Sequence, residues 1–243
     1  MRRWSILLAI ALSGCATAVP VGDYVEVLEG TTRVSCSGAD LEGPFGPRLA
    51  RGAMLVAPGG TRGAWVEVEA RALEDGGGEG TCQNVSRLWI DENGAARVAF
   101  TQRPGWEGRN GNALDLVDWS PDGSRLVLEL HTWTYPTDPA DPVLLVWDAA
   151  TNATEQLLLA PEVHASFGDD CAFRFRGRGF DESGWAIVEV LPREDAAIES
   201  CVDSARVWRV QPDGLEVESV AEGTLPRMWS TRTTPPRRSA PLP

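Results

Sequence analysis

Residues that could carry chemistry gather along one short segment in the middle of the chain. Side chains alternate between the two faces of a strand, so a strand through ELHTWTY puts Glu129, His131, Trp133 and Tyr135 on one face. Such a row of polar and aromatic side chains could bind a ligand. The favoured interpretation is plainer: the strand emerges here from the core into a wet loop, and His131 belongs to that exit.

Three carboxylates recur at regular spacing. Glu69, Glu129 and Glu189 lie sixty residues apart and close similar apolar runs of alternating pattern. One equivalent position in three repeats could form a ring of carboxylates that holds a cation or a basic group. The favoured alternative is that each glutamate marks a solvated strand end.

Arginines alternate with phenylalanines in the segment FRFRGR. A strand there places Arg174, Arg176 and Arg178 on one face. If this strand lines the inside of the fold, three guanidinium groups approach a channel and could bind an anion. The favoured alternative is that they pair with nearby acids such as Asp169, Asp170 or Glu189.

Motifs of catalysis are missing from the sequence. It contains no G-x-S-x-G, S-x-x-K, P-loop, dinucleotide-binding or H-E-x-x-H pattern. Its two histidines, His131 and His164, do not lie near a nucleophile-like motif. No C-x-x-C pair occurs either, which makes a zinc site unexpected. We therefore expect a protein that is not an enzyme, with no catalytic residues, no cofactor and no metal.

Composition and charge restrict the class of protein. The chain has 243 residues, 43% of them hydrophobic and 23% charged, which is typical of a packed globular protein. Its formal net charge is −13, and all 22 basic residues are arginine. A chain this acidic does not attract nucleic acid through its overall field. The 25 glycines and 17 prolines favour short strands and turns over long helices.

The N-terminus has the features of an export signal. In residues 1–14 two arginines precede an apolar run that is too short to cross a hydrocarbon core of about 30 Å. The motif LSGC, which ends at Cys15, resembles the bacterial lipobox. The resemblance implies cleavage before Cys15 and its lipidation, with several acyl chains for stable anchoring, and makes residues 15–22 a tether. The alternative is an ordinary signal peptide cut near Ala18.

The remaining cysteines form an even set. In an exported protein, four cysteines favour disulfides. Three pairings are possible, and the favoured one joins cysteines within one repeat: Cys36 with Cys82, and Cys171 with Cys201.

A repeated pattern of strands and turns organises the chain. Each unit of about 60 residues reads as strand, tight turn, strand, long loop, strand, tight turn, strand. The units span about 48–103, 113–160 and 171–221. Turn dipeptides such as Asn93-Gly94 and Asp122-Gly123 tolerate the positive φ that hairpins require. No window of 11 or more residues keeps a helical period, so the mature chain is predicted to be nearly all β.

The second unit, with its WSPDG core, resembles the TolB-type, WD-like β-propeller repeat. The resemblance implies a propeller-like domain over 23–230, made of about three four-stranded antiparallel blades with the first strand of each innermost. Propellers usually need at least four blades, and residues 23–36 could supply a partial fourth or lengthen the first. An open arc or an assembly of two chains is also compatible. Residues 231–243 read as a disordered Pro/Arg-rich tail.

Loops between the second and third strands of the units are acidic. Blade geometry sends these loops to one face, which could dock a basic protein partner or a cation such as calcium; the alternative is a surface kept soluble by charge. The connector 103–112 could add Trp106 as an exposed anchor. The loops contain one arginine, Arg193, against nine acids: Glu74, Asp75, Glu79, Asp138, Asp141, Glu194, Asp195, Glu199 and Asp203.

These patterns together favour a lipid-anchored protein of the bacterial cell envelope. It would sit on the cell membrane or the outer membrane, facing the periplasm or the exterior. The expected role is non-catalytic binding or scaffolding. Two alternatives are a hydrolase-associated or carbohydrate-active propeller, and a structural envelope protein without a defined ligand.

Overall fold

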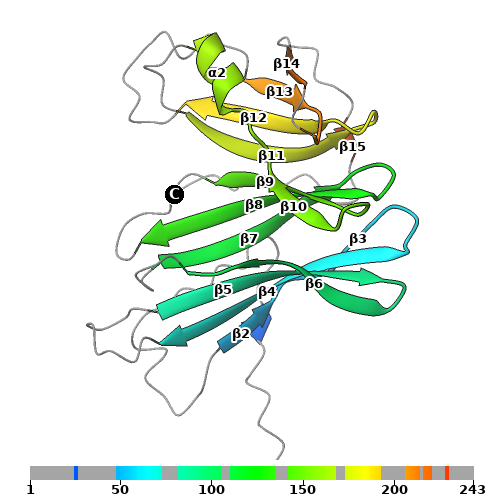
Figure 1. Ribbon diagram of the computed structural model, residues 1–243, viewed down its shortest axis with the longest axis vertical. Coiled ribbons are helices and arrows are strands. Elements are labelled where there is room, and N and C mark those ends of the chain that lie inside the picture. The colour runs from blue at the N-terminus through cyan, green and yellow to red at the C-terminus, as the bar shows by residue number, and fades with distance from the viewer. Residues whose placement is uncertain are drawn as a thin grey trace, which may run out of the picture.

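Three β-sheets, each built around four antiparallel strands, follow one another along the chain. Figure 1 shows them stacked face to face in chain order, with the first sheet at the bottom and the third at the top. The prediction of an all-β fold with three four-stranded antiparallel meanders is confirmed. The computed structural model describes residues 25–26, 48–72, 82–104, 110–134, 142–167, 173–192, 206–213, 216–220 and 228–229.

The first sheet has a first strand in two pieces. Its elements are β1 (Val25–Glu26), β2 (Arg48–Arg51), β3 (Leu55–Val56), β4 (Arg62–Ala72), β5 (Cys82–Glu92) and β6 (Ala95–Gln102). Both β2 and β3 pair antiparallel with β4, because residues 52–54 interrupt the strand between them. The pair β1 and β2 is parallel. Of the segment 23–36, the two described residues therefore extend the first sheet.

The second and third sheets repeat the meander. The second has the order β10-β9-β8-β7, and the third has the order β14-β13-β12-β11-β15. Their elements are β7 (Asn110–Trp119), β8 (Arg125–Thr134), β9 (Val143–Asp148), β10 (Ala153–Gln156), β11 (Phe173–Asp181), β12 (Ala186–Pro192), β13 (Val207–Val210), β14 (Val217–Val220) and β15 (Met228–Trp229).

One helix, α2 (Ala160–Phe167), was not predicted. Its eight residues are too few to show a helical period in the sequence. The last strand of the second unit, β10, ends at Gln156, before the apolar residues of the run TEQLLL. The chain leaves the sheet there because Leu157 and Leu159 pack with Val163 into the core between the second and third sheets. No helix among the described residues is long and apolar enough to cross a membrane.

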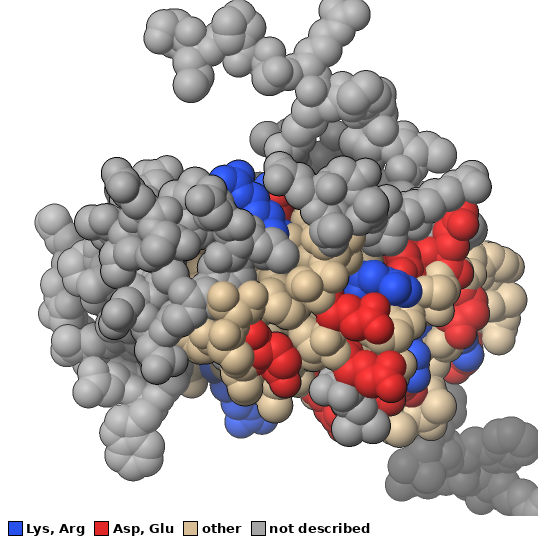
Figure 2. All heavy atoms as spheres, turned by 90° about the horizontal axis from the view of Figure 1, so that it is seen from above, with Lys and Arg blue, Asp and Glu red and all other residues tan. Residues whose placement is uncertain are grey.

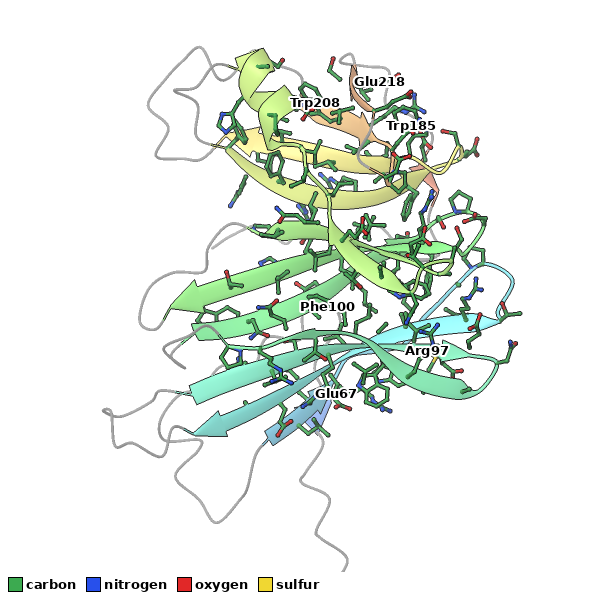
Figure 3. The ribbon with its side chains drawn as sticks, viewed as in Figure 1. Glu67, Arg97, Phe100, Trp185, Trp208 and Glu218 are labelled. Carbon is green, nitrogen blue, oxygen red and sulfur yellow. The ribbon has the colours of Figure 1, made fainter. Side chains whose placement is uncertain are left out.

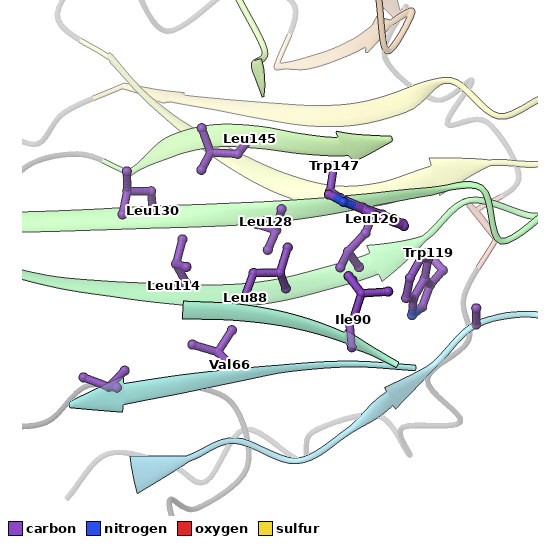
Figure 4. Packing of buried hydrophobic residues seen from close by; sticks show 13 residues of the cluster. Val66, Leu88, Ile90, Leu114, Trp119, Leu126, Leu128, Leu130, Leu145 and Trp147 are labelled. Carbon is purple, nitrogen blue, oxygen red and sulfur yellow. The ribbon is translucent and has the colours of Figure 1, made fainter. Parts of the chain in front are cut away.

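The second sheet has no solvent-facing side over most of its width. Leu126, Leu128 and Leu130 of β8 pack against the first sheet, as the close-up in Figure 4 shows. Val127, between them in sequence, packs with Leu144 and residues of the third sheet. Because alternate residues of β8 meet different sheets, Leu126, Val127 and Leu128 are all apolar and all buried, as is typical of strands buried on both faces.

Aspartates fasten the hairpin turns. In the β7–β8 turn, Asp122 accepts hydrogen bonds from the hydroxyls of Ser120 (2.6 Å) and Ser124. In the β11–β12 turn, Asp181 accepts the backbone N–H groups of Ser183 and Trp185 at 2.9 and 3.0 Å. Such aspartates accept hydrogen bonds from backbone N–H groups of the turn that have no partner in the strand ladder.

The carboxyl group of Asp181 is also ion-paired. Arg209 Nε lies 2.9 Å from Asp181 Oδ2, and its guanidinium covers the ring of Trp185, which Figure 3 labels at this end of the third sheet. Burial alone would raise the pKa of Asp181, but the hydrogen bonds and the charge of Arg209 outweigh it. The pKa therefore lies below its ordinary value of 3.8.

We predict that Leu128→Ala lowers the free energy of unfolding by about 2–5 kcal/mol, because it opens a cavity between the first and second sheets. Leu158→Ala is the matched control: Leu158 is 61% exposed, and its loss should cost about 0.5 kcal/mol or less. Urea unfolding followed by tryptophan fluorescence measures both. Equal losses would contradict the stacked arrangement.

Asp181→Asn should destabilise the protein by about 1.5–3 kcal/mol at pH 7, because it removes a buried charged acceptor. Since the folded pKa is depressed, the contribution of Asp181 is present above pH 4 and is lost as the pH falls through the folded pKa. The difference between wild type and variant should therefore shrink as the pH falls below about 4. Glu155→Gln, at an exposed position of β10, is the control. A difference that stays constant with pH would rule out the charge as its cause.

Candidate functional site

Glu129 and His131 lie at the interface between the second and third sheets. The alternation along β8 that turns Leu128 and Leu130 toward the first sheet turns Glu129 and His131 the other way. His131 is only 8% exposed. The interpretation of this stretch as an exit into a wet loop is therefore wrong for His131, which is a core residue.

Asp115 on β7 stands directly opposite Glu129 in the strand ladder. The side chains of Asp115 and Glu129 are 12% and 15% exposed. Like charges directly opposite each other destabilise a sheet, and burial adds the cost of removing both carboxylates from water. This pair therefore needs positive charge or hydrogen-bond donors close by.

Two nitrogen atoms lie close to the pair. His131 Nε2 lies 3.3 Å from Asp115 Oδ2 and 3.6 Å from Glu129 Oε2. The backbone N–H of Gly177, on β11 of the third sheet, donates to Glu129 Oε1 at 2.7 Å. Glu129 therefore links the two sheets directly. We name Asp115, Glu129 and His131 the interface triad.

A glycine lets the third sheet approach the triad. A Cβ atom on Gly177 would lie 3.1–3.4 Å from side-chain atoms of Val117, Val127 and Leu144. This is tighter than ordinary van der Waals contact, so a larger residue would push β11 away from the second sheet and lengthen the bond to Glu129.

A β-bulge sets the register of the triad. Next to the turn, Trp119 pairs with Leu126 and Asp118 pairs with Val127, but beyond Val117 the ladder shifts by one residue. Without that shift, Asp115 would stand opposite Leu130 and face the first sheet. The bulge turns it onto the face of Glu129 and His131 instead. Sequence reasoning missed Asp115 because a one-residue bulge leaves no clear signal in DLVDW.

The proposed ring of three glutamates is not formed. Counted from the pair that closes each turn, Glu129 and Glu189 are equivalent, but in the first sheet that position is Val66. Glu69 lies on the face of β4 opposite Val66 and Val68, which pack toward the second sheet.

Glu69 and Glu189 are instead ion-paired. Arg87 Nη2 lies 2.8 Å from Glu69 Oε2, and Arg178 pairs with Glu189. Their side chains are only 14% and 20% exposed. The interpretation of these two glutamates as solvated strand ends is therefore wrong. Each carboxylate is held by an arginine on the same sheet.

The three arginines of β11 are exposed and lie on one face, as predicted. Phe173 and Phe175, which alternate with them, pack toward the second sheet, so Arg174, Arg176 and Arg178 face away from it. The pairing of Arg178 with Glu189 confirms the favoured alternative of ion pairing for this arginine. Figure 2, which views the molecule from above, shows acidic and basic side chains interspersed on the described surface.

Several predicted residues lie outside the described ranges. These are the lipidation residue Cys15, the anchor Trp106, and Cys36, Cys171 and Cys201 of the predicted disulfides. Cys82 begins β5, where only its backbone is described. The acidic loops fall outside these ranges too.

Comparisons with known proteins give no relative. No protein-family model, no curated protein and no solved structure matches the chain.

Proposed function

We propose that this protein is a membrane-anchored lipoprotein of the bacterial cell envelope whose β domain is a non-catalytic binding or scaffold module. The anchor is proposed from the sequence: a short export signal followed by LSGC with Cys15 as the lipidated residue. We further propose that the three sheets are blades of a propeller-like array, which the TolB-like repeat in the second sheet supports.

The direction of the strands is the observation that carries the binding role. The second strands of the three sheets, β4, β8 and β12, all end on the same side of the molecule in Figure 1. The connections that leave these ends, residues 73–81, 135–141 and 193–205, hold nine acidic residues and one arginine. Three acidic loops starting from one side of a rigid stack suit a basic partner or a cation.

Cys15→Ser should move the protein from the membrane fraction to the soluble fraction, because it removes the thiol that carries the lipid. Fractionation and immunoblotting measure the distribution, and Ala18→Ser, in the tether, is the control. Mass spectrometry of the mature wild-type chain should find a lipid-modified N-terminus at Cys15. An unmodified N-terminus near residue 19 would establish the ordinary signal peptide instead.

Neutralising the acidic loops should abolish partner capture. We expect the wild-type chain, immobilised in detergent, to retain an envelope protein saturably at low salt. A variant with Glu74→Gln, Asp75→Asn and Glu79→Gln in one loop and Glu194→Gln and Asp195→Asn in another should retain at least tenfold less of it. The control variant neutralises Glu155 and Glu216, exposed acids on described parts of the β domain. If no protein is retained saturably, the binding role is contradicted and the alternative of a structural envelope protein without a defined ligand is favoured.

A further inference from the structure

We propose that the interface triad of Asp115, Glu129 and His131 binds a divalent transition-metal ion, with zinc as the best-fitting probe. All three ligands come from β7 and β8, so the ion would lie on the face of the second sheet that packs against the third. The proposal is independent of the lipid anchor and of the acidic loops.

The spacing of the donor atoms fits a tetrahedral ion. Bonds of about 2.0–2.2 Å from zinc to imidazole nitrogen and carboxylate oxygen place neighbouring tetrahedral ligands about 3.4 Å apart. His131 Nε2 lies 3.3 Å from Asp115 Oδ2 and 3.6 Å from Glu129 Oε2. One ligand atom from each of the three residues lies within 4.8 Å of the others. Both nitrogen-to-oxygen distances exceed the 2.7–3.2 Å of an ordinary N–H···O hydrogen bond.

The charge of the triad also suits a divalent cation. Two carboxylates with about 12–15% of their side-chain surface exposed carry two negative charges, and a neutral imidazole adds none. A divalent ion bound by two carboxylates and one neutral histidine makes the cluster neutral.

The third sheet shows how the same position is neutralised by the protein itself. Both β7 and β11 carry a bulge two residues before the pair that closes the turn, at Val117 and Arg178. The ladder then places Asp115 opposite Glu129 in the second sheet and Arg176 opposite Glu189 in the third. The third sheet thus has an arginine where the second has another acid.

The donor set selects the class of metal. One imidazole and two carboxylates suit zinc and, less tightly, manganese or ferrous iron. Calcium and magnesium prefer six or more oxygen ligands, and the imidazole makes the triad a poor match for them. Three protein ligands leave a fourth position on zinc for water or for a group from a partner.

Metal should also strengthen the contact between the two sheets, through the orientation of Glu129. Glu129 already accepts the backbone N–H of Gly177 on β11. An ion on its other oxygen would fix that carboxylate in the orientation this hydrogen bond requires. Binding only to the folded state raises the thermal midpoint in proportion to the logarithm of free metal over its dissociation constant.

The test is zinc titration of the purified full chain after treatment with a chelator. Calorimetry should give one zinc per chain, and zinc should raise the thermal midpoint. Asp115→Asn and His131→Gln should each weaken binding at least tenfold. Glu67→Gln is the matched control: its side chain is 12% exposed and lies near Arg51 and Arg87 on the first sheet, where Figure 3 labels it, and zinc affinity should be unchanged.

Spectroscopy on the unmodified chain keeps the proposal testable if a variant fails to fold. X-ray absorption at the zinc edge should show only nitrogen and oxygen ligands, including one imidazole. A sulfur ligand would overturn the proposal by assigning the metal to cysteines. Absence of zinc binding to the wild-type chain would also overturn it, as would full affinity in folded Asp115→Asn and His131→Gln variants. None of these outcomes bears on membrane anchoring or loop-mediated capture.

Discussion

The structure depends on the burial of the second sheet between two others. A sheet with one wet face can place charged residues there at little cost, but β8 has Leu126, Leu128 and Leu130 against the first sheet and Val127 against the third. Every polar residue in the middle of this strand therefore needs its hydrogen-bond or ion-pair partners inside an interface between two sheets. Glu129 and His131 are such residues, which is why they carry more information than the charged residues on the outer faces.

The two interfaces of the second sheet solve this problem differently. Toward the first sheet, the buried polar residues Asn84, Ser86 and Asn112 are neutral, and Asn112 Nδ2 donates to the backbone carbonyl of Asn84 at 2.7 Å. Toward the third sheet, the groups are ionisable, and a backbone N–H of Gly177 takes part. Amide-to-carbonyl contacts stabilise one interface without charge, whereas the other is sensitive to whatever neutralises its carboxylates.

The order of strands could be predicted from the sequence, but the details of the site could not. Period-2 runs and turns such as Asn93-Gly94 located the strands of all three sheets, because local patterns determine hairpins. The position of Asp115 depends on a bulge, and a one-residue shift moves a side chain to the opposite face. The equal spacing of Glu69, Glu129 and Glu189 misled because spacing along the chain does not fix the position in a strand. Glu69 lies three residues further from its turn than the other two, and an odd offset puts it on the opposite face. Helix α2 was missed because tertiary packing of Val163, and not a long amphipathic pattern, stabilises it.

The outer edges of the sheets bear on self-association. In the described parts of the chain, β10 and β14 are edge strands of only four residues each. The longer edges, β6 and β7, have eight and ten residues and are each broken by a bulge, at Ala99 and at Val117, and β6 carries the charged side chain of Arg97. Short, bulged and charged edges offer few free backbone groups in a continuous row. A strand of a neighbouring copy therefore finds little free backbone to pair with. This disfavours the growth of the sheets, strand by strand, into fibrous aggregates.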